Sequence, residues 1–134
     1  MQLTKTVNCF VCGEANRHGL QATFQSNGIL MCSFGSVLLG ENFQGWGQIV
    51  HGGILAALLD EACIYAAMSL GLQAVTAELQ VRYRKPVPCG QTVTLFGEVI
   101  KHRRNVVTAR SRLALAGEVY AEAEARLFLG KFSD

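Results

Sequence analysis

The stretch HGGILAALLDEACIYAAMSLG, from His51 to Gly71, is the most apolar part of this 134-residue chain. It predicts one long helix from about Gly53 to Leu70, with Gly71 as a natural C-terminal stop. Because this helix is apolar nearly all round, other parts of the protein must cover it on every side. Two adjacent carboxylates, Asp60 and Glu61, nevertheless lie near its middle, and their presence in a buried helix needs a physical reason.

The sequence on either side of the helix has the alternation of β-strands. Two short strands are expected between Leu20 and Val37, around the turn at 26–28. Four longer alternating segments follow the helix, namely AELQVRYR, QTVTLFGEVI, NVVTARSRLAL and GEVYAEAEARLFL. Short links join them, with a basic turn at 101–104, and this indicates an antiparallel sheet. We therefore expect an α+β fold in which a curved sheet of five or six strands wraps around the helix.

Length and composition limit the class of protein. With 134 residues, half of them hydrophobic and 16% charged, the chain is predicted to be one folded domain over 1–134, with an irregular segment at 1–19. The two acids make the helix a poor membrane span, and the first residues lack the apolar core of a signal peptide. A cytoplasmic protein without membrane or nucleic-acid partners is therefore expected.

The two acids point in different directions on the predicted helix. At 100° per residue, Asp60 shares a face with mostly small residues, whereas Glu61 lies among bulkier ones. A buried carboxylate is unfavourable unless it is paired, hydrogen-bonded or neutralised. One interpretation is a structural acid that pairs with an arginine or caps a loop amide. The other is a poorly solvated carboxylate that acts as a base or nucleophile; Glu61 is interpreted as structural.

The start of the helix offers a second functional element. Gly52 and Gly53 expose backbone N–H groups at a positive helix end, which attracts anions and developing oxyanions. His51 either hydrogen-bonds the loop at the helix start or holds a substrate carbonyl. Gly53 and Asp60 are separated by about 10.5 Å along the helix axis, too far to act on one carbonyl. Joint catalysis would therefore require an active site shared across a dimer interface.

The segments QGWGQIVHGGILAALLDEA and VTAELQVRYRKPVPCGQ resemble the hotdog-fold acyl-CoA thioesterases, in particular the phenylacetate-pathway type. The resemblance extends over about Leu20 to Leu129. It implies a sheet wrapped around one long helix, a homodimer with a continuous sheet and a dimer of dimers. It also implies hydrolysis of an acyl-CoA thioester, with no metal and no other cofactor.

The resemblance also assigns roles to individual residues. Asp60 would be the general base or nucleophile, and the N–H of Gly52 or Gly53 would polarise the thioester carbonyl. Gln44 matches a residue that positions the thioester or water, although Gln48 remains an alternative. Thr76, on the strand after the helix, would assist from the Asp60 side.

Other residues are candidates for substrate binding. Trp46, in the loop before the helix, either lines an acyl pocket or packs in the core. Basic residues gather between positions 82 and 112, and they are either a solvated strand face or a site for an anionic ligand. By resemblance, five of them would bind the phosphates of coenzyme A: Arg82, Arg84, Lys101, Arg103 and Arg104.

The amino-terminal CFVCGEANRHGL lies outside this resemblance. Cys9 and Cys12, with His18, have the residue types of three zinc ligands. A single C-x-x-C pair is a weak signal, so structural thiols are the preferred interpretation, with metal binding and redox chemistry as alternatives.

The sequence therefore predicts an acyl-CoA thioesterase. The alternative from another class is a non-catalytic acyl-CoA binding or sensor module on the same fold. A dehydratase that acts through His51 is disfavoured, because Asp60 lies where thioesterases keep their acid.

Overall fold

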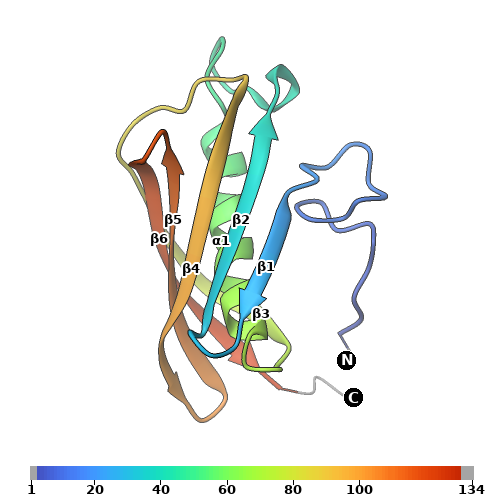
Figure 1. Ribbon diagram of the computed structural model, residues 1–134, viewed down its shortest axis with the longest axis vertical. Coiled ribbons are helices and arrows are strands. Elements are labelled where there is room, and N and C mark those ends of the chain that lie inside the picture. The colour runs from blue at the N-terminus through green and yellow to red at the C-terminus, as the bar shows by residue number, and fades with distance from the viewer. Residues whose placement is uncertain (1–2, 131–134) are drawn as a thin grey trace.

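A computed structural model describes residues 3–130, so the first two and last four residues of the expected domain 1–134 lie outside the described residues. It contains one long helix and one sheet (Figure 1). The helices are η1, a short 3₁₀ helix at Glu41–Phe43, and α1 at Gly52–Met68. The strands are β1 (Thr23–Asn27), β2 (Cys32–Leu39), β3 (Ala74–Tyr83), β4 (Gln91–Arg103), β5 (Val106–Leu115) and β6 (Glu118–Leu129).

The six strands form one antiparallel sheet in the order β1-β2-β4-β5-β6-β3. The helix α1 lies against one face of this sheet (Figure 1). Because β3 follows α1 in the chain but pairs with β6, the sheet places its two edge strands, β1 and β3, on opposite sides of the helix. The predicted α+β class, the strand number and the hotdog fold are confirmed.

Alanines allow α1 to approach the sheet closely. Ala62 lies in one apolar cluster with Ala121 and Ala123 of β6, and Ala67 lies in a second cluster with Ala125. The opposite side of α1 is less well covered, and Ala57, Asp60 and Ile64 are only half-buried. Within the single chain, the sheet therefore leaves this stripe of the helix only partly covered.

The helix and the sheet are in close contact at Gly97 of β4. A Cβ atom at this position would lie 2.3 Å from the carbonyl oxygen of Ala62 and 2.6 Å from Oγ of Ser33. The Ser33 hydroxyl donates to the Ala62 carbonyl at 2.6 Å, and the Ser111 hydroxyl donates to the Leu59 carbonyl at 2.8 Å. These hydroxyl groups are buried, but each has a hydrogen-bond partner. They therefore hold α1 in place without the free-energy penalty of an unpaired buried polar group.

The link between β4 and β5 differs from the expected basic turn at 101–104. Lys101, His102 and Arg103 pair with β5, and the turn consists of Arg104 and Asn105. Arg104 adopts a left-handed conformation with φ 56°. A two-residue connection matches the twist of antiparallel strands, so the ladder extends further than the run of basic residues suggests.

The segment before β1 has no helix or strand, as expected for the irregular amino-terminal region. Turns hold it together, and its backbone bonds to itself from Leu20 to Phe10 and from Ala22 to Val11. It lies beside β1, away from β5 and β6 (Figure 1). Across residues 3–130, no helix has both the length and the hydropathy that crossing a membrane requires.

We predict that Gly97→Ala destabilises the protein, because the new methyl group would collide with the backbone of α1. Overpacking of this kind lowers the free energy of unfolding by ~1–3 kcal/mol, which urea titration measures. Gly47→Ala is the matched control, since a Cβ there meets nothing within 4 Å, and it should change stability by less than about 0.5 kcal/mol. Equal stability of the two variants would contradict the close contact.

Candidate active site

Asp60 lies on the half-buried side of α1 and contacts the first part of β3. The Thr76 hydroxyl donates to Oδ1 of Asp60 at 2.5 Å. A β-bulge between Thr76 and Glu78 shifts the pairing of β3 with β6 at this point. Bulges often redirect a side chain next to an active site, and the sequence pattern gave no sign of this one. Thr76 therefore lies on the Asp60 side of α1, whereas its assisting role in catalysis stays a prediction.

The electrostatic environment of Asp60 favours its protonated form. Burial raises the pKa of the Asp60 carboxyl, and the hydrogen bond from Thr76 opposes this shift. No Lys, Arg or His within residues 3–130 forms an ion pair with Asp60. The interpretation of Asp60 as one half of a buried ion pair with arginine is therefore wrong for the described part of the chain.

The start of α1 is capped by His51. Its Nδ1 accepts a hydrogen bond from the N–H of Gly53 at 2.8 Å. The Tyr83 hydroxyl donates to the carbonyl of Gly52 at 2.8 Å. The sequence does not reveal this contact, because Tyr83 alternates with Leu79 and Val81 like an ordinary apolar strand residue. In the described residues, the Gly52 N–H has no acceptor. Of the two glycines considered, Gly52 is therefore the one with a free donor.

The loop before α1 forms a small hairpin-like turn. Gln44 bridges to Val50, and its Oε1 accepts from the backbone N–H of Gln48 at 2.9 Å. Both glutamine residues are exposed, and a role for Gln44 or Gln48 in positioning the thioester stays a prediction. Trp46 is 85% exposed, so the interpretation that it packs in the core of this chain is wrong, whereas a role in an acyl pocket stays a prediction.

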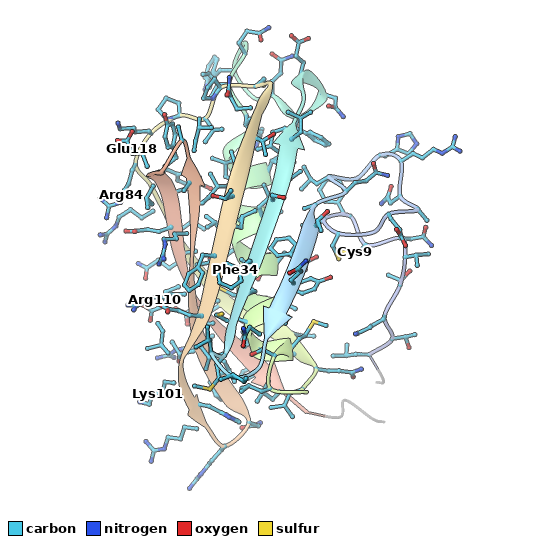
Figure 2. The ribbon with its side chains drawn as sticks, in the orientation of Figure 1. Cys9, Phe34, Arg84, Lys101, Arg110 and Glu118 are labelled. Carbon is cyan, nitrogen blue, oxygen red and sulfur yellow. The ribbon has the colours of Figure 1, made fainter. Side chains whose placement is uncertain are left out.

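The basic residues fall into two separate groups. Arg82 and Arg84 lie at the far end of β3, where Arg84 pairs with Glu122 at 2.6 Å. The other three lie at the β4–β5 hairpin, around a hollow of about 340 Å³ that is also lined by Arg126. Figure 2 shows Arg84 and Lys101 towards opposite ends of the sheet. The five residues therefore do not form one phosphate site within a single chain.

Of these two groups, the hairpin lies at the same end of the sheet as Thr76. Thr76 pairs with Leu127 of β6, Leu127 pairs with Val107 of β5, and Val107 pairs with His102 of β4. Strands are about 4.8 Å apart, so three steps separate the Thr76 strand from the hairpin by roughly 14 Å. Along β3, Arg82 lies six residues from Thr76, roughly 20 Å at ~3.3 Å per residue. The hairpin group (Lys101, Arg103 and Arg104) is therefore the basic group nearer to Thr76, the residue that contacts Asp60.

Glu61 points to the other side of α1, towards the amino-terminal segment. The Cys9 thiol donates to Oε2 of Glu61 at 3.3 Å, and the Tyr65 hydroxyl donates to Sγ of Cys12 at 3.3 Å. Burial raises the pKa of the Cys12 thiol to about 12. This shift disfavours the thiolate form of Cys12 in the absence of a cation.

Comparison with known proteins gives further information on the fold and family. A sequence model described as the thioesterase superfamily matches residues 47–122, more than half of the chain. A search of curated proteins gives no match.

Solved structures are similar over most of the chain. A protein described as a thioesterase superfamily protein has a TM-score of 0.84 and 28% identity, over 92% of this chain and 61% of that chain. The E. coli PaaI protein from the phenylacetic acid degradation operon has a TM-score of 0.76 and 22% identity, over 84% and 82% of the two chains. A hypothetical thioesterase protein from Streptococcus pneumoniae, solved with coenzyme A, has a TM-score of 0.72 and 22% identity, over 76% and 84%.

The present chain thus spans less than two thirds of the length of the first of these proteins. The family match begins in the loop before α1 and ends within β6. It therefore includes the helix start, Asp60 and Thr76. Together with the single long helix packed against an antiparallel sheet, this match shows that the chain belongs to the thioesterase superfamily.

Proposed function

We propose that this protein is an acyl-CoA thioesterase, which hydrolyses a thioester to a carboxylate and free coenzyme A. The observation that carries the proposal is the half-buried Asp60 with its hydrogen bond from Thr76, in a chain that belongs to the thioesterase superfamily. The structure of a similar protein with coenzyme A supports this substrate class.

Asp60 would activate the attacking group. As a general base it takes a proton from water, and the resulting hydroxide attacks the thioester carbonyl. As a nucleophile, its carboxylate attacks the carbonyl directly, and water then hydrolyses the mixed anhydride. In both routes the C–S bond breaks, and the sulfur leaves as the coenzyme A thiolate, which is then protonated. Poor solvation makes the Asp60 carboxylate a stronger base, and Thr76 would hold it in one orientation.

The Gly52 N–H would stabilise the oxyanion. It is a backbone donor at a positive helix end, and it has no acceptor among the described residues. His51 would keep this end of the helix rigid, because it caps the N–H of Gly53. Preorganised donors of this kind are effective because they need not reorient during the reaction.

The two groups would meet across a homodimer. Gly52 and Asp60 lie eight residues apart on one straight helix, about 12 Å along its axis, so one chain cannot bring both to one carbonyl. The edge strand β3 pairs only with β6 in the described chain, and its other edge can add a second copy. Because Thr76 lies on β3, a partner bound there would place its own helix start near Asp60. Two such dimers would form the tetramer.

Replacing Asp60 by Asn tests its chemical role. The amide has nearly the same volume but cannot act as a base or nucleophile, so we expect kcat for acyl-CoA hydrolysis to fall by ~10²–10⁴. The melting temperature should not decrease, because the substitution removes a poorly solvated carboxyl group. Glu124→Gln, on the exposed face of β6, is the matched control and should keep the rate.

The measurements are steady-state rates on a panel of acyl-CoAs with a thiol reagent, together with thermal melting of the same samples. A stable Asp60→Asn protein with full activity would exclude the catalytic assignment. Binding of acyl-CoA without hydrolysis by the wild-type protein would favour the non-catalytic binding module instead.

Mixed dimers test whether the active site is shared. Asp60→Asn and His51→Ala should each inactivate the homodimer. In a mixed dimer, one shared site would contain both substitutions and the other would contain neither. After random mixing, roughly a quarter of all active sites should therefore be intact and active. No recovery, or light scattering that shows an active monomer, would contradict the shared site.

The hairpin group would bind the phosphates of coenzyme A. Changing both Arg103 and Arg104 to Glu turns attraction into repulsion, so KM for acyl-CoA should rise on the order of tenfold at low salt and less at high salt. Hydrolysis of a short acyl-pantetheine, which lacks these phosphates, should not change. Arg17→Glu, an exposed charge reversal in the amino-terminal segment, is the control. An equal loss on both substrates would mean that the two arginines act on folding or chemistry.

A further inference from the structure

We propose that Cys9, Cys12 and Glu61 bind a zinc ion that ties the amino-terminal segment to helix α1. This site is separate from the proposed active site and does not depend on the thioesterase function. It replaces the preferred interpretation of the cysteines as structural thiols, and it differs from the Cys9–Cys12–His18 set. His18 is exposed and lies outside the cluster that the two cysteines form.

The three side chains converge from distant parts of the sequence. The two sulfur atoms and a carboxylate oxygen of Glu61 all lie within 4.8 Å of one another, and all three residues are half-buried. In a tetrahedral zinc site with Zn–S bonds of ~2.3 Å, two sulfur ligands are separated by roughly 3.8 Å. The ligand atoms would therefore need to move by only about 1 Å to bind the metal. Figure 2 shows Cys9 in the segment beyond β1.

The charge balance at this position favours a cation. Glu61 is half-buried, and no Lys, Arg or His within residues 3–130 forms an ion pair with it. Its hydrogen bond to a described residue comes from the thiol of Cys9, which is a weak donor. A partly desolvated carboxylate normally has a stronger partner. A zinc ion would supply this partner, and two sulfur ligands select zinc over magnesium or calcium.

The backbone from Cys9 to Gly13 forms a tight turn that brings the two cysteine side chains to the same place. The N–H of Cys12 donates to Sγ of Cys9 at 3.5 Å, and the N–H of Gly13 donates to the Cys9 carbonyl at 2.9 Å. A Cβ at Gly13 would lie 2.4 Å from the nitrogen of Cys9, so only glycine permits this tight turn. Hydrogen bonds to sulfur stabilise the thiolate that a metal requires.

The fourth coordination position would be taken by water. Tyr65 lies one helical turn after Glu61 and donates to Cys12 Sγ at 3.3 Å, and its ring stacks on Phe24 with centroids 4.9 Å apart. This fixed phenol would continue to donate to the Cys12 thiolate. Because one ligand comes from the helix and two come from the segment before β1, the metal would fasten this segment to α1.

The test uses the full chain, kept reduced, with zinc and cobalt as the probes. Purified protein should bind one zinc per chain, measured by metal analysis after dialysis. Cobalt should give the sulfur-to-metal charge-transfer absorption that thiolate ligands produce. Cys9→Ser and Cys12→Ser should lose this absorption. Glu61→Gln should weaken zinc binding by at least ~10-fold, because the loss of a residue that only hydrogen-bonds a metal ligand already has an effect of this size. Removal of zinc with a chelator should lower the melting temperature of the wild type.

Two matched variants serve as controls. Cys89→Ser changes a half-buried cysteine outside the cluster, and Asp60→Asn changes the neighbouring acid. Both should keep zinc, although Asp60→Asn should be inactive, so the zinc site and the proposed function can fail separately. If a cysteine variant does not fold, the cobalt spectrum of the wild type still shows whether thiolates bind the metal. Failure of the reduced protein to bind zinc, absence of the thiolate band, or zinc bound equally by Glu61→Gln would overturn the proposal.

Discussion

The close contact between the backbone of α1 and the sheet determines the geometry of the rest of this protein. Gly97 lacks a side chain at the place where the Ala62 carbonyl approaches β4. Hydroxyl groups from β5, β2 and β1 donate to the carbonyls of Leu59, Ala62 and Tyr65. These carbonyls are three residues apart, so they lie along one side of the helix. The three bonds therefore fix both the position of α1 and its rotation about its own axis.

This fixed rotation sends two adjacent acids to two different environments. Neighbouring residues on a helix point about 100° apart, and Asp60 therefore reaches the bulge at the start of β3, whereas Glu61 reaches the cysteines of the amino-terminal segment. A small rotation of α1 would move both carboxylates away from their partners. The two acids in the apolar helix thus have separate explanations, and the same contact with the sheet supports both.

Much of the fold could be predicted from the sequence, because its signals are local. The continuous apolar stretch and its flanking glycines located α1 to within two residues at each end, and alternation located the long strands. The bulge after Thr76 and the extension of β4 through Arg103 could not be predicted. Both depend on which strands pair, and a single strand does not carry this information. The serine hydroxyls that hold α1 also look like ordinary strand residues until the helix lies on top of them.

The candidate site shows the same division between local and long-range signals. Asp60 and the glycines of the helix start stand out within a few residues of each other, and the resemblance supplied Thr76. The cysteines near Glu61 are about fifty residues away in the sequence. Sequence spacing therefore suggests His18, and not Glu61, as the third metal ligand beside Cys9 and Cys12. Tyr83 was also missed, because its hydroxyl reaches Gly52 from the next strand while its ring follows the apolar alternation of β3.

The half-exposed side of α1 connects stability with the proposed function. A single sheet buries one side of the helix and leaves a stripe with Ala57, Asp60 and Ile64 only partly covered. Along the axis of α1, Gly52, whose N–H has no acceptor among residues 3–130, lies about 12 Å from Asp60. In the proposed dimer, a partner at the β3 edge would cover this apolar stripe and would also bring the missing oxyanion donor. The burial of apolar surface and the assembly of the active site would then be one event, so a chain that lost its partner would lose catalysis before its own sheet unfolded.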